Sequence, residues 1–101
     1  LIGYLRAQPR TACGYYSNYA DGVYALTGIR AYMPPKKTGL AMYGLAAFRQ
    51  QVERQSCNYV VWFAGWSPGG VYGVEELGGM YRLEPVYTHS AGVIYRLTAR
   101  P

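Results

Sequence analysis

An unbroken apolar run near the middle of the chain places the strongest constraint on the fold. Residues 59–64 read Tyr-Val-Val-Trp-Phe-Ala, with no polar residue at alternate positions. A strand with one face in water alternates apolar and polar residues, whereas a strand covered on both faces does not. The run therefore predicts a strand that is buried on both faces, as in a parallel sheet with helices on each side.

The remaining pattern of apolar and turn residues predicts strands that alternate with helices. Helices are expected over residues 2–8, 19–26, 40–55 and 74–77, and strands over residues 11–16, 29–33, 59–64, 81–87 and 93–98. We therefore expect an α/β fold: a small three-layer sandwich with a mostly parallel sheet (β-α-β-α-β) and a C-terminal antiparallel β-hairpin. The first strand would be central, the second and third would flank it, and the hairpin would form the far edge.

Local signals set the expected boundaries. Asn18 is expected to cap the second helix, and Asp21 follows it at the spacing of a capping box. Gly28 is expected to end that helix in a left-handed conformation. Pro34 and Pro35 are expected to stop the second strand, because proline has no amide hydrogen for a sheet ladder.

Length and composition predict a single soluble domain over residues 1–101. Half of the 101 residues are hydrophobic, which is enough for a packed core. No apolar stretch approaches the roughly 20 residues that a membrane-spanning helix needs. The chain opens on Leu1 in an apolar run, so we expect it to be part of a longer protein.

The chain is basic, with ten Lys or Arg residues against five acidic ones. Only Lys36 and Lys37 are adjacent, whereas nucleic-acid binding requires basic residues gathered on one face. No nucleic-acid partner is therefore expected. Two interpretations remain for the charge: a solvated surface, or attraction to anionic lipid headgroups.

The cysteines leave two alternatives open. Cys13 and Cys57 lie outside any CxxC motif, and His89 is the only histidine, so no metal site and no cofactor are expected. The two residues are either free thiols or, since both lie near expected strand starts, partners in a disulfide. A disulfide would imply an oxidising compartment.

A ligand-binding cleft is expected where the strands end, because ligands of open parallel sheets bind beyond the carboxyl ends of the strands. The candidate ligand-binding residues there are Ser17, Asn18, Asp21, Lys36, Lys37 and Trp66, with Ser67 beside the last. Each also has a plainer interpretation as a helix cap, a solvated loop residue or a packing residue. The glycine-rich stretch over residues 65–70 lacks the order of a phosphate-binding loop.

No catalytic residue is expected in the chain. His89 falls in an expected hairpin turn with nothing to orient it, and Glu75 and Glu76 are adjacent on a short helix, so they point in different directions. The chain also has twelve tyrosines. They are interpreted either as half-buried packing residues or as exposed rings for stacking on sugars.

Several short motifs follow one another in the order of a known domain. They are Tyr16-Ser17-Asn18, Leu26-Thr27-Gly28-Ile29-Arg30, Cys57-Asn58-Tyr59-Val60-Val61-Trp62, Glu75-Glu76-Leu77, Leu83-Glu84-Pro85-Val86 and Gly92-Val93-Ile94-Tyr95-Arg96-Leu97. With them the chain resembles the soluble C-terminal domain of bacterial multi-pass membrane glycosyltransferases that are similar to dolichyl-phosphate-mannose protein mannosyltransferases. It departs from that pattern at Tyr19-Ala20, where Asp-Pro is often expected.

The resemblance implies that the chain is the C-terminal fragment of a longer membrane protein, and that this parent transfers a sugar from a lipid-linked donor. This domain would lie on the extracytoplasmic face of a bacterial membrane, and the catalytic acid would lie elsewhere in the parent. The expected function is therefore a non-catalytic accessory domain that contacts the membrane portion of the parent and a lipid headgroup or lipid-linked sugar. The alternative is a small-ligand module that binds a nucleotide or phosphate at the carboxyl ends of the strands.

Overall fold

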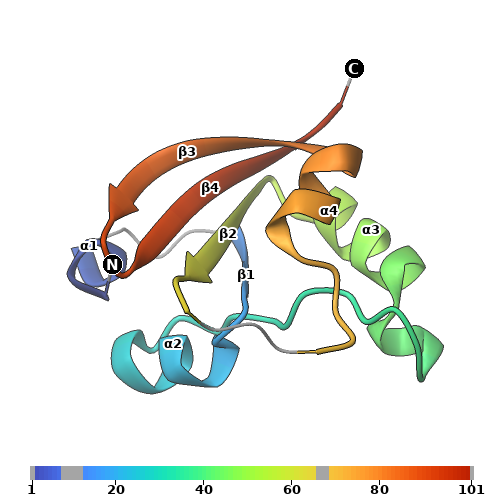
Figure 1. Ribbon diagram of the computed structural model, residues 1–101, viewed down its shortest axis with the longest axis horizontal. Coiled ribbons are helices and arrows are strands. Elements are labelled where there is room, and N and C mark those ends of the chain that lie inside the picture. The colour runs from blue at the N-terminus through green and yellow to red at the C-terminus, as the bar shows by residue number, and fades with distance from the viewer. Residues whose placement is uncertain (1, 8–12, 66–68, 101) are drawn as a thin grey trace.

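The fold is a mixed α/β domain built around a four-stranded sheet (Figure 1). The structure is a computed structural model that describes residues 2–7, 13–65 and 69–100. Its elements are α1 (Ile2–Ala7), β1 (Cys13–Ser17), α2 (Ala20–Thr27), the 3-10 helix η1 (Ala41–Tyr43), α3 (Leu45–Arg54), β2 (Cys57–Phe63), α4 (Val74–Met80), β3 (Tyr81–His89) and β4 (Gly92–Ala99).

The strand order is β1-β2-β4-β3. β1 and β2 pair in parallel, and β4 is antiparallel to both β2 and β3. β1, β2 and β3 therefore run in one direction, and β4 alone among these strands is reversed. The sheet is mixed, and the expected mostly parallel arrangement is not found. The expected antiparallel hairpin is present as β3 and β4, but β4 docks directly on β2, and β1 lies at the end of the strand order instead of at its centre.

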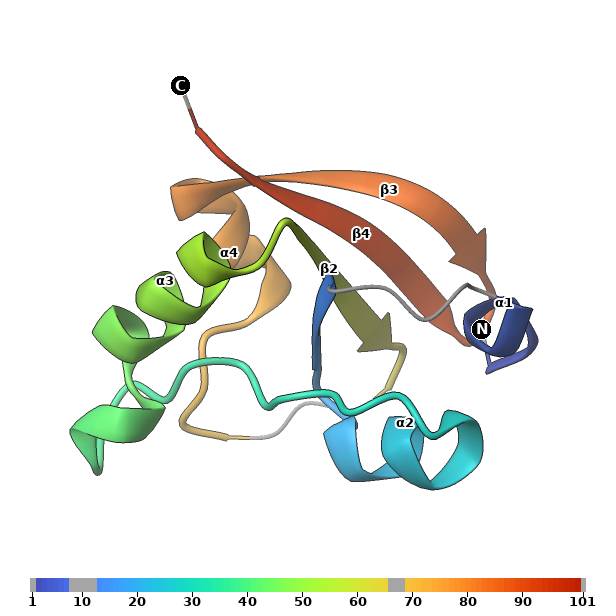
Figure 2. The same ribbon diagram turned by 180° about the vertical axis from the view of Figure 1, so that it is seen from behind.

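Residues 29–33 do not form a strand, although they lie beside β1 as expected. A single parallel bridge joins Tyr32 to Tyr16. The amide of Tyr32 donates to the carbonyl of Tyr15 at 2.8 Å, and the amide of Ser17 donates to the carbonyl of Tyr32 at 2.9 Å. Pairing stops there because Pro34 and Pro35 follow and have no amide hydrogen to donate. Figure 2 shows this segment passing from α2 toward η1.

The expected cap of α2 by Asn18 is wrong. Tyr19 holds the N-cap position and makes no side-chain cap bond, while the Asn18 side chain bonds to the backbone of Phe63 instead. Asn18 directly follows β1, and the neighbouring strand β2 ends at Phe63, so that backbone is within reach. The expected end of the helix is confirmed: Gly28 is left-handed with φ 74°, and its amide donates to the carbonyl of Tyr24.

Two other helix boundaries differ from expectation. The expected helix over residues 40–55 is divided into η1 and α3, because Gly44 between them has extended backbone with φ −90° and ψ −176°. α4 does not end at Gly78 but continues to Met80. Leu77 in that helix is fully buried, so packing against the sheet outweighs the low helix propensity of glycine.

Two apolar clusters pack against opposite faces of the sheet. One contains Tyr16, Phe48, Val52, Val60, Leu77, Tyr81 and Leu97, and the other contains Leu5, Tyr15, Val23, Val61 and Ile94. Figure 1 shows α3 and α4 near one end of the sheet and α1 and α2 near the other. The consecutive residues Val60 and Val61 belong to different clusters, and both have 0% exposure. This confirms that the central apolar run is a strand buried on both faces.

Candidate functional site

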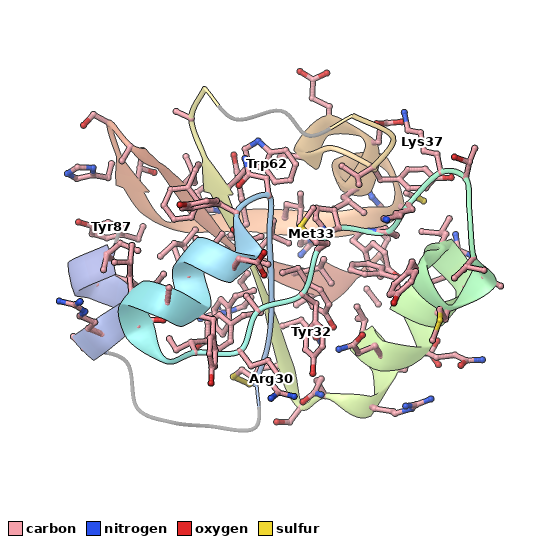
Figure 3. The ribbon with its side chains drawn as sticks, turned by 90° about the horizontal axis from the view of Figure 1, so that it is seen from below. Arg30, Tyr32, Met33, Lys37, Trp62 and Tyr87 are labelled. Carbon is pink, nitrogen blue, oxygen red and sulfur yellow. A yellow bond between two sulfur atoms is a disulfide. The ribbon has the colours of Figure 1, made fainter. Side chains whose placement is uncertain are left out.

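The clearest concave feature near the expected site is an apolar groove of about 430 Å³. It extends from the start of α2 along residues 31–36 to η1 and α3. Its lining residues are Tyr16, Ala20, Asp21, Ala31, Tyr32, Met33, Pro34, Pro35, Lys36, Met42, Tyr43, Gly44, Ala47, Phe48 and Gln51. We call it the α3 groove. Figure 3 views the molecule from below, with Arg30, Tyr32 and Met33 on the segment that passes between α2 and α3.

The base of the α3 groove is formed by packed aromatic rings. Tyr16 and Phe48 meet edge to face with 4.8 Å between ring centroids, and Tyr32 lies 6.3 Å from Tyr16. Burial raises the pKa of Tyr16 to about 12. The hydroxyl of Tyr16 donates to Oδ1 of Asn58 at 3.3 Å, and Asn58 in turn donates to the carbonyl of Val52 at 3.0 Å. The polar groups of Tyr16 and Asn58 at the base are therefore hydrogen-bonded within the chain.

The rim of the α3 groove exposes large apolar side chains. Met42 is 67% exposed, Tyr43 is 53% exposed, and Met33 and Tyr32 are also well exposed. Nζ of Lys36 lies 5.3 Å from the ring centroid of Tyr43, which is cation–π range. Contiguous exposed apolar groups of this kind mark interaction sites, and Lys36 adds a positive charge beside them.

Backbone bonds hold the segment that forms the groove wall. Beyond Tyr32, the amide of Lys36 donates to the carbonyl of Tyr43 at 2.7 Å, which ties this segment to η1. On the other side, the amide of Tyr72 donates to the carbonyl of Pro35, and the amide of Lys37 donates to the carbonyl of Gly70, both at 2.9 Å. The wall is therefore anchored at both ends and preformed.

The two adjacent lysines have different partners. Nζ of Lys37 lies 2.7 Å from a carboxylate oxygen of Glu76 and 5.6 Å from the ring centroid of Tyr72. The hydrogen bond from Lys37, followed by the bond from the amide of Gly73, lowers the pKa of Glu76. Lys36 lines the groove and Lys37 does not, so the structure separates the residues that the sequence analysis treated as a pair.

The structure brings Asp21 and Lys36 to the α3 groove, whereas Ser17, Asn18 and Lys37 do not line it. Ser17 and Asn18 are buried, and Oγ of Ser17 accepts the amide of Tyr19 at 3.0 Å. The side-chain amide of Asn18 is hydrogen-bonded to the backbone of Phe63. Trp66, together with Ser67, lies outside the described residues. Ser17 and Asn18 thus have structural roles at the end of the sheet.

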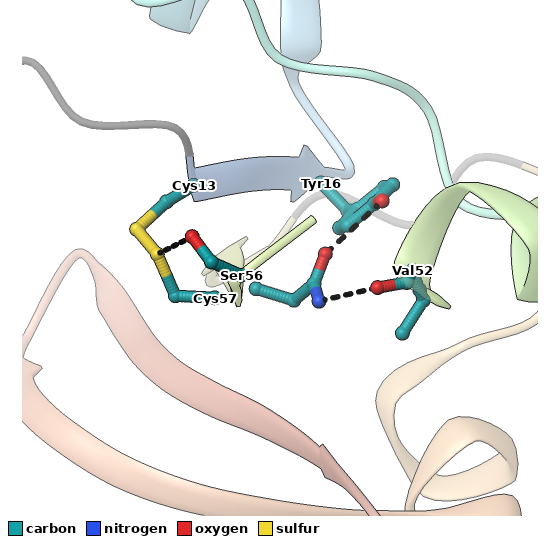
Figure 4. Close-up of a disulfide and its surroundings, with 6 residues drawn as sticks. Cys13, Tyr16, Val52, Ser56 and Cys57 are labelled. Atoms are coloured by element: carbon teal, nitrogen blue, oxygen red, sulfur yellow. Dashed lines mark hydrogen bonds between the residues drawn. A yellow bond between two sulfur atoms is a disulfide. The ribbon is translucent and has the colours of Figure 1, made fainter. Parts of the chain in front are cut away.

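Cys13 and Cys57 are joined in a disulfide between the first residues of β1 and β2 (Figure 4). The two residues are direct partners in the parallel register, with 4.6 Å between their Cα atoms. The bond fixes the end of the strand pair opposite to the end where Asn18 meets Phe63. Of the alternatives that the sequence left open, the structure has the disulfide.

Sequence analysis missed most of the groove wall. Met42 and Tyr43 were assigned to a continuous helix, and Tyr32 to a sheet strand, so their exposure was not foreseen. A usable signal was present: Met42 and Tyr43 lie off the apolar face that Ala41, Leu45 and Phe48 define, yet they are large and apolar.

No reactive cluster accompanies the groove in the part of the chain that the structure describes. No three His, Cys, Asp or Glu side chains there are grouped to hold a metal ion. His89, expected in the hairpin turn, is instead the last residue of β3, and its Nδ1 accepts the amide of Ala91 at 3.1 Å. Among the described residues, no helix is both long and apolar enough to cross a bilayer. Comparison with known protein families, with curated proteins and with solved structures gives no match for this chain.

Proposed function

We propose that this chain is a non-catalytic accessory domain that binds and presents a ligand through the α3 groove. The observation that carries the proposal is the preformed apolar groove with Lys36 on its rim. Ligand sites of this kind combine an apolar lining with a few placed polar groups. Asp21 provides an acidic group in the same lining, which would restrict the orientation of a bound molecule.

The proposal includes a cellular setting. We propose that the domain belongs to a membrane glycosyltransferase-like protein on the extracytoplasmic face of a bacterial membrane, where it meets the membrane portion of the parent and a lipid headgroup or lipid-linked sugar. The resemblance described above supports this setting. The disulfide between Cys13 and Cys57 is consistent with it, because disulfides persist in oxidising compartments. We also propose that the architecture is a three-layer sandwich. The apolar clusters on both faces of the sheet support this arrangement.

A thermal-shift screen tests the function. The probes are glycerol phosphate, a short-chain polyprenyl phosphate, simple sugars and nucleotides. A probe that binds only the folded chain raises the melting temperature, since a hundredfold excess over the dissociation constant adds about 2.7 kcal/mol of stability. We expect a shift with the polyprenyl phosphate.

Two alanines on α3 provide a matched pair of variants. Ala47 lines the groove, whereas Ala46 is exposed and does not. The shift should disappear in Ala47→Arg and persist in Ala46→Arg, which adds the same side chain to the same helix. A shift with nucleotides alone that survives Ala47→Arg would favour the alternative site at the strand ends. If no probe, including the peptides introduced below, binds the chain, the proposed function is wrong.

A further inference from the structure

We propose that the α3 groove takes an extended polypeptide segment, which adds to residues 31–33 as a short extra strand. This inference rests on the proposed function, because it names the ligand class of the same groove. It depends on three features: the open backbone of the groove wall, the apolar side chains opposite that wall, and the charges at its ends.

The first feature is the direction of the backbone groups. Both the amide and the carbonyl of Tyr32 are bonded to β1, at Tyr15 and Ser17. Successive residues of an extended chain direct these groups to opposite sides. The amides and carbonyls of Ala31 and Met33 therefore point away from β1, and both residues line the α3 groove.

These outward groups are unused within residues 2–7, 13–65 and 69–100. No protein partner is found there for the amide or the carbonyl of either Ala31 or Met33. An edge with alternating free donors and acceptors is a template for another extended chain. A sugar or a lipid tail has no regular series of donors and acceptors to match it, whereas a polypeptide has.

The opposite edge of the sheet is a poorer template. There β3 carries Pro85, and its register shifts between Pro85 and Tyr87. A proline and a bulge are features that protect edge strands from pairing. The edge at residues 31–33 has no such protection until Pro34, so an added strand would pair along these residues only.

The second feature is the apolar surface facing this edge. Ala47 of α3 and Met42 of η1 line the groove together with the wall segment, and Phe48 forms part of its base. A peptide between an open edge and a helix would bond through its backbone and place alternate side chains in the groove. We therefore expect the bound segment to carry apolar residues at alternate positions.

The third feature is charge. The exposed Arg30 precedes the edge and Lys36 follows it, whereas Asp21 is the single acidic residue of the groove lining. Net charge is +5 over the whole chain. Opposite charge favours association and orients the partner. The expected occupant is thus an extended apolar segment with an acidic residue that can meet Lys36 or Arg30.

The test uses a pooled library of acetylated, amidated hexapeptides that alternate Val or Ile with variable positions containing one Glu. Binding is followed on the full 101-residue chain by amide NMR. We expect the largest shift changes and the slowest hydrogen exchange at the amides of Ala31 and Met33. The best peptide is then remade with N-methyl groups on the backbone that faces the edge. The affinity of the methylated peptide should fall at least about tenfold, because each N-methyl group removes a hydrogen-bond donor and leaves the edge carbonyl that it faced without a partner.

The variants and probes separate this inference from the proposed function. Ala47→Arg should abolish peptide binding, and Ala46→Arg should retain it. If a polyprenyl phosphate binds in the groove while the whole peptide pool fails, the inference is overturned and the proposed function stands. If the N-methylated peptide binds as well as its parent, strand addition is overturned even though a peptide binds. If no peptide, lipid phosphate, sugar or nucleotide binds, both are overturned.

Discussion

Asn18 and Phe63 are joined by a reciprocal pair of hydrogen bonds. Nδ2 of Asn18 donates to the carbonyl of Phe63 and the amide of Phe63 donates to Oδ1 of Asn18, each at 2.9 Å. The side-chain amide thereby copies the pairing of a backbone peptide group and extends the contact between β1 and β2 by one more residue. Asn18 is 1% exposed, so water cannot easily replace either bond.

Asn18→Ala should therefore destabilise the chain strongly. The change leaves a donor and an acceptor of Phe63 without partners, and each such loss costs about 1 to 3 kcal/mol. We expect the free energy of unfolding, measured by urea denaturation, to fall by about 2 to 4 kcal/mol. Asp21→Ala is the control, because this exposed residue makes no cap bond, and it should change stability by less than about 0.5 kcal/mol. Equal effects of the two substitutions would contradict this account.

Asn18 also shows where sequence analysis reached its limit. An Asn between a strand and a helix matches the N-cap pattern, but the Phe63 backbone lies 45 residues away in sequence. Only the parallel pairing of β1 with β2 brings them together. Local preference of this kind is a weak guide when a tertiary partner competes for the same side chain.

The features that the sequence predicts correctly depend on single residues at element ends or on the pattern of apolar residues. The central buried strand follows from its continuous apolar run, and the end of α2 follows from Gly28. The β3–β4 hairpin was predicted, but the strand order was missed because it depends on where that hairpin docks, which the spacing of residues does not reveal. The α3 groove was missed for a related reason: it lies between residues 31–36 and α3, and their relative placement is set by long-range packing.

Reduction of the disulfide should lower stability substantially. Cys13 and Cys57 close a loop between residues separated by 44 positions. Closing a loop of that length lowers the entropy of the unfolded chain by an amount equivalent to about 4 kcal/mol at 25 °C. We expect a reducing agent to decrease the free energy of unfolding by about 2 to 4 kcal/mol in a urea titration.

The double variant Cys13→Ser, Cys57→Ser is the matched control for reduction. It should resemble the reduced chain in stability and should not respond to the reducing agent. The register of β1 and β2 should persist in it, because Asn18 still fixes the other end of the strand pair. If reduction leaves the stability of the native chain unchanged, the disulfide does not contribute as stated.

Ionisation of Tyr16 should lower the free energy of unfolding at alkaline pH. Its pKa is raised from 10.0 to about 12 in the folded chain, chiefly because burial disfavours the charged form. The folded state therefore holds the proton more tightly than the unfolded state does. The resulting contribution is complete below about pH 10 and is lost as the pH rises toward 12, by about 2 to 3 kcal/mol in total.

The comparison variant for this step is Tyr16→Phe. At neutral pH it should be destabilised by about 1 kcal/mol, since Oδ1 of Asn58 loses its donor. Between about pH 10 and 12 it should lose less stability than the native chain. Tyr15 and Tyr81 also have raised pKa values, but they are present in both proteins and cancel in the difference. Parallel stability curves for the two proteins over this range would show that Tyr16 is not the group responsible.

Replacing Lys36 and replacing Lys37 by methionine should have different effects on the pKa of Glu76. Lys37 lowers the pKa of Glu76 by direct hydrogen bonding, while Lys36 lies over Tyr43 instead. Lys37→Met should therefore raise the pKa of Glu76 toward its usual value, as measured by NMR titration of its carboxyl carbon, and Lys36→Met should not.

A lowered carboxyl pKa favours folding above the ordinary pKa, and this benefit is lost as the pH falls through the lowered value. In Lys37→Met that acid-side loss should shrink, because folded and unfolded states then bind the proton more equally. Since the pair is exposed, added salt should weaken the effect in the native chain. An equal shift of Glu76 in both variants would mean that general positive charge, and not the contact with Lys37, sets its pKa.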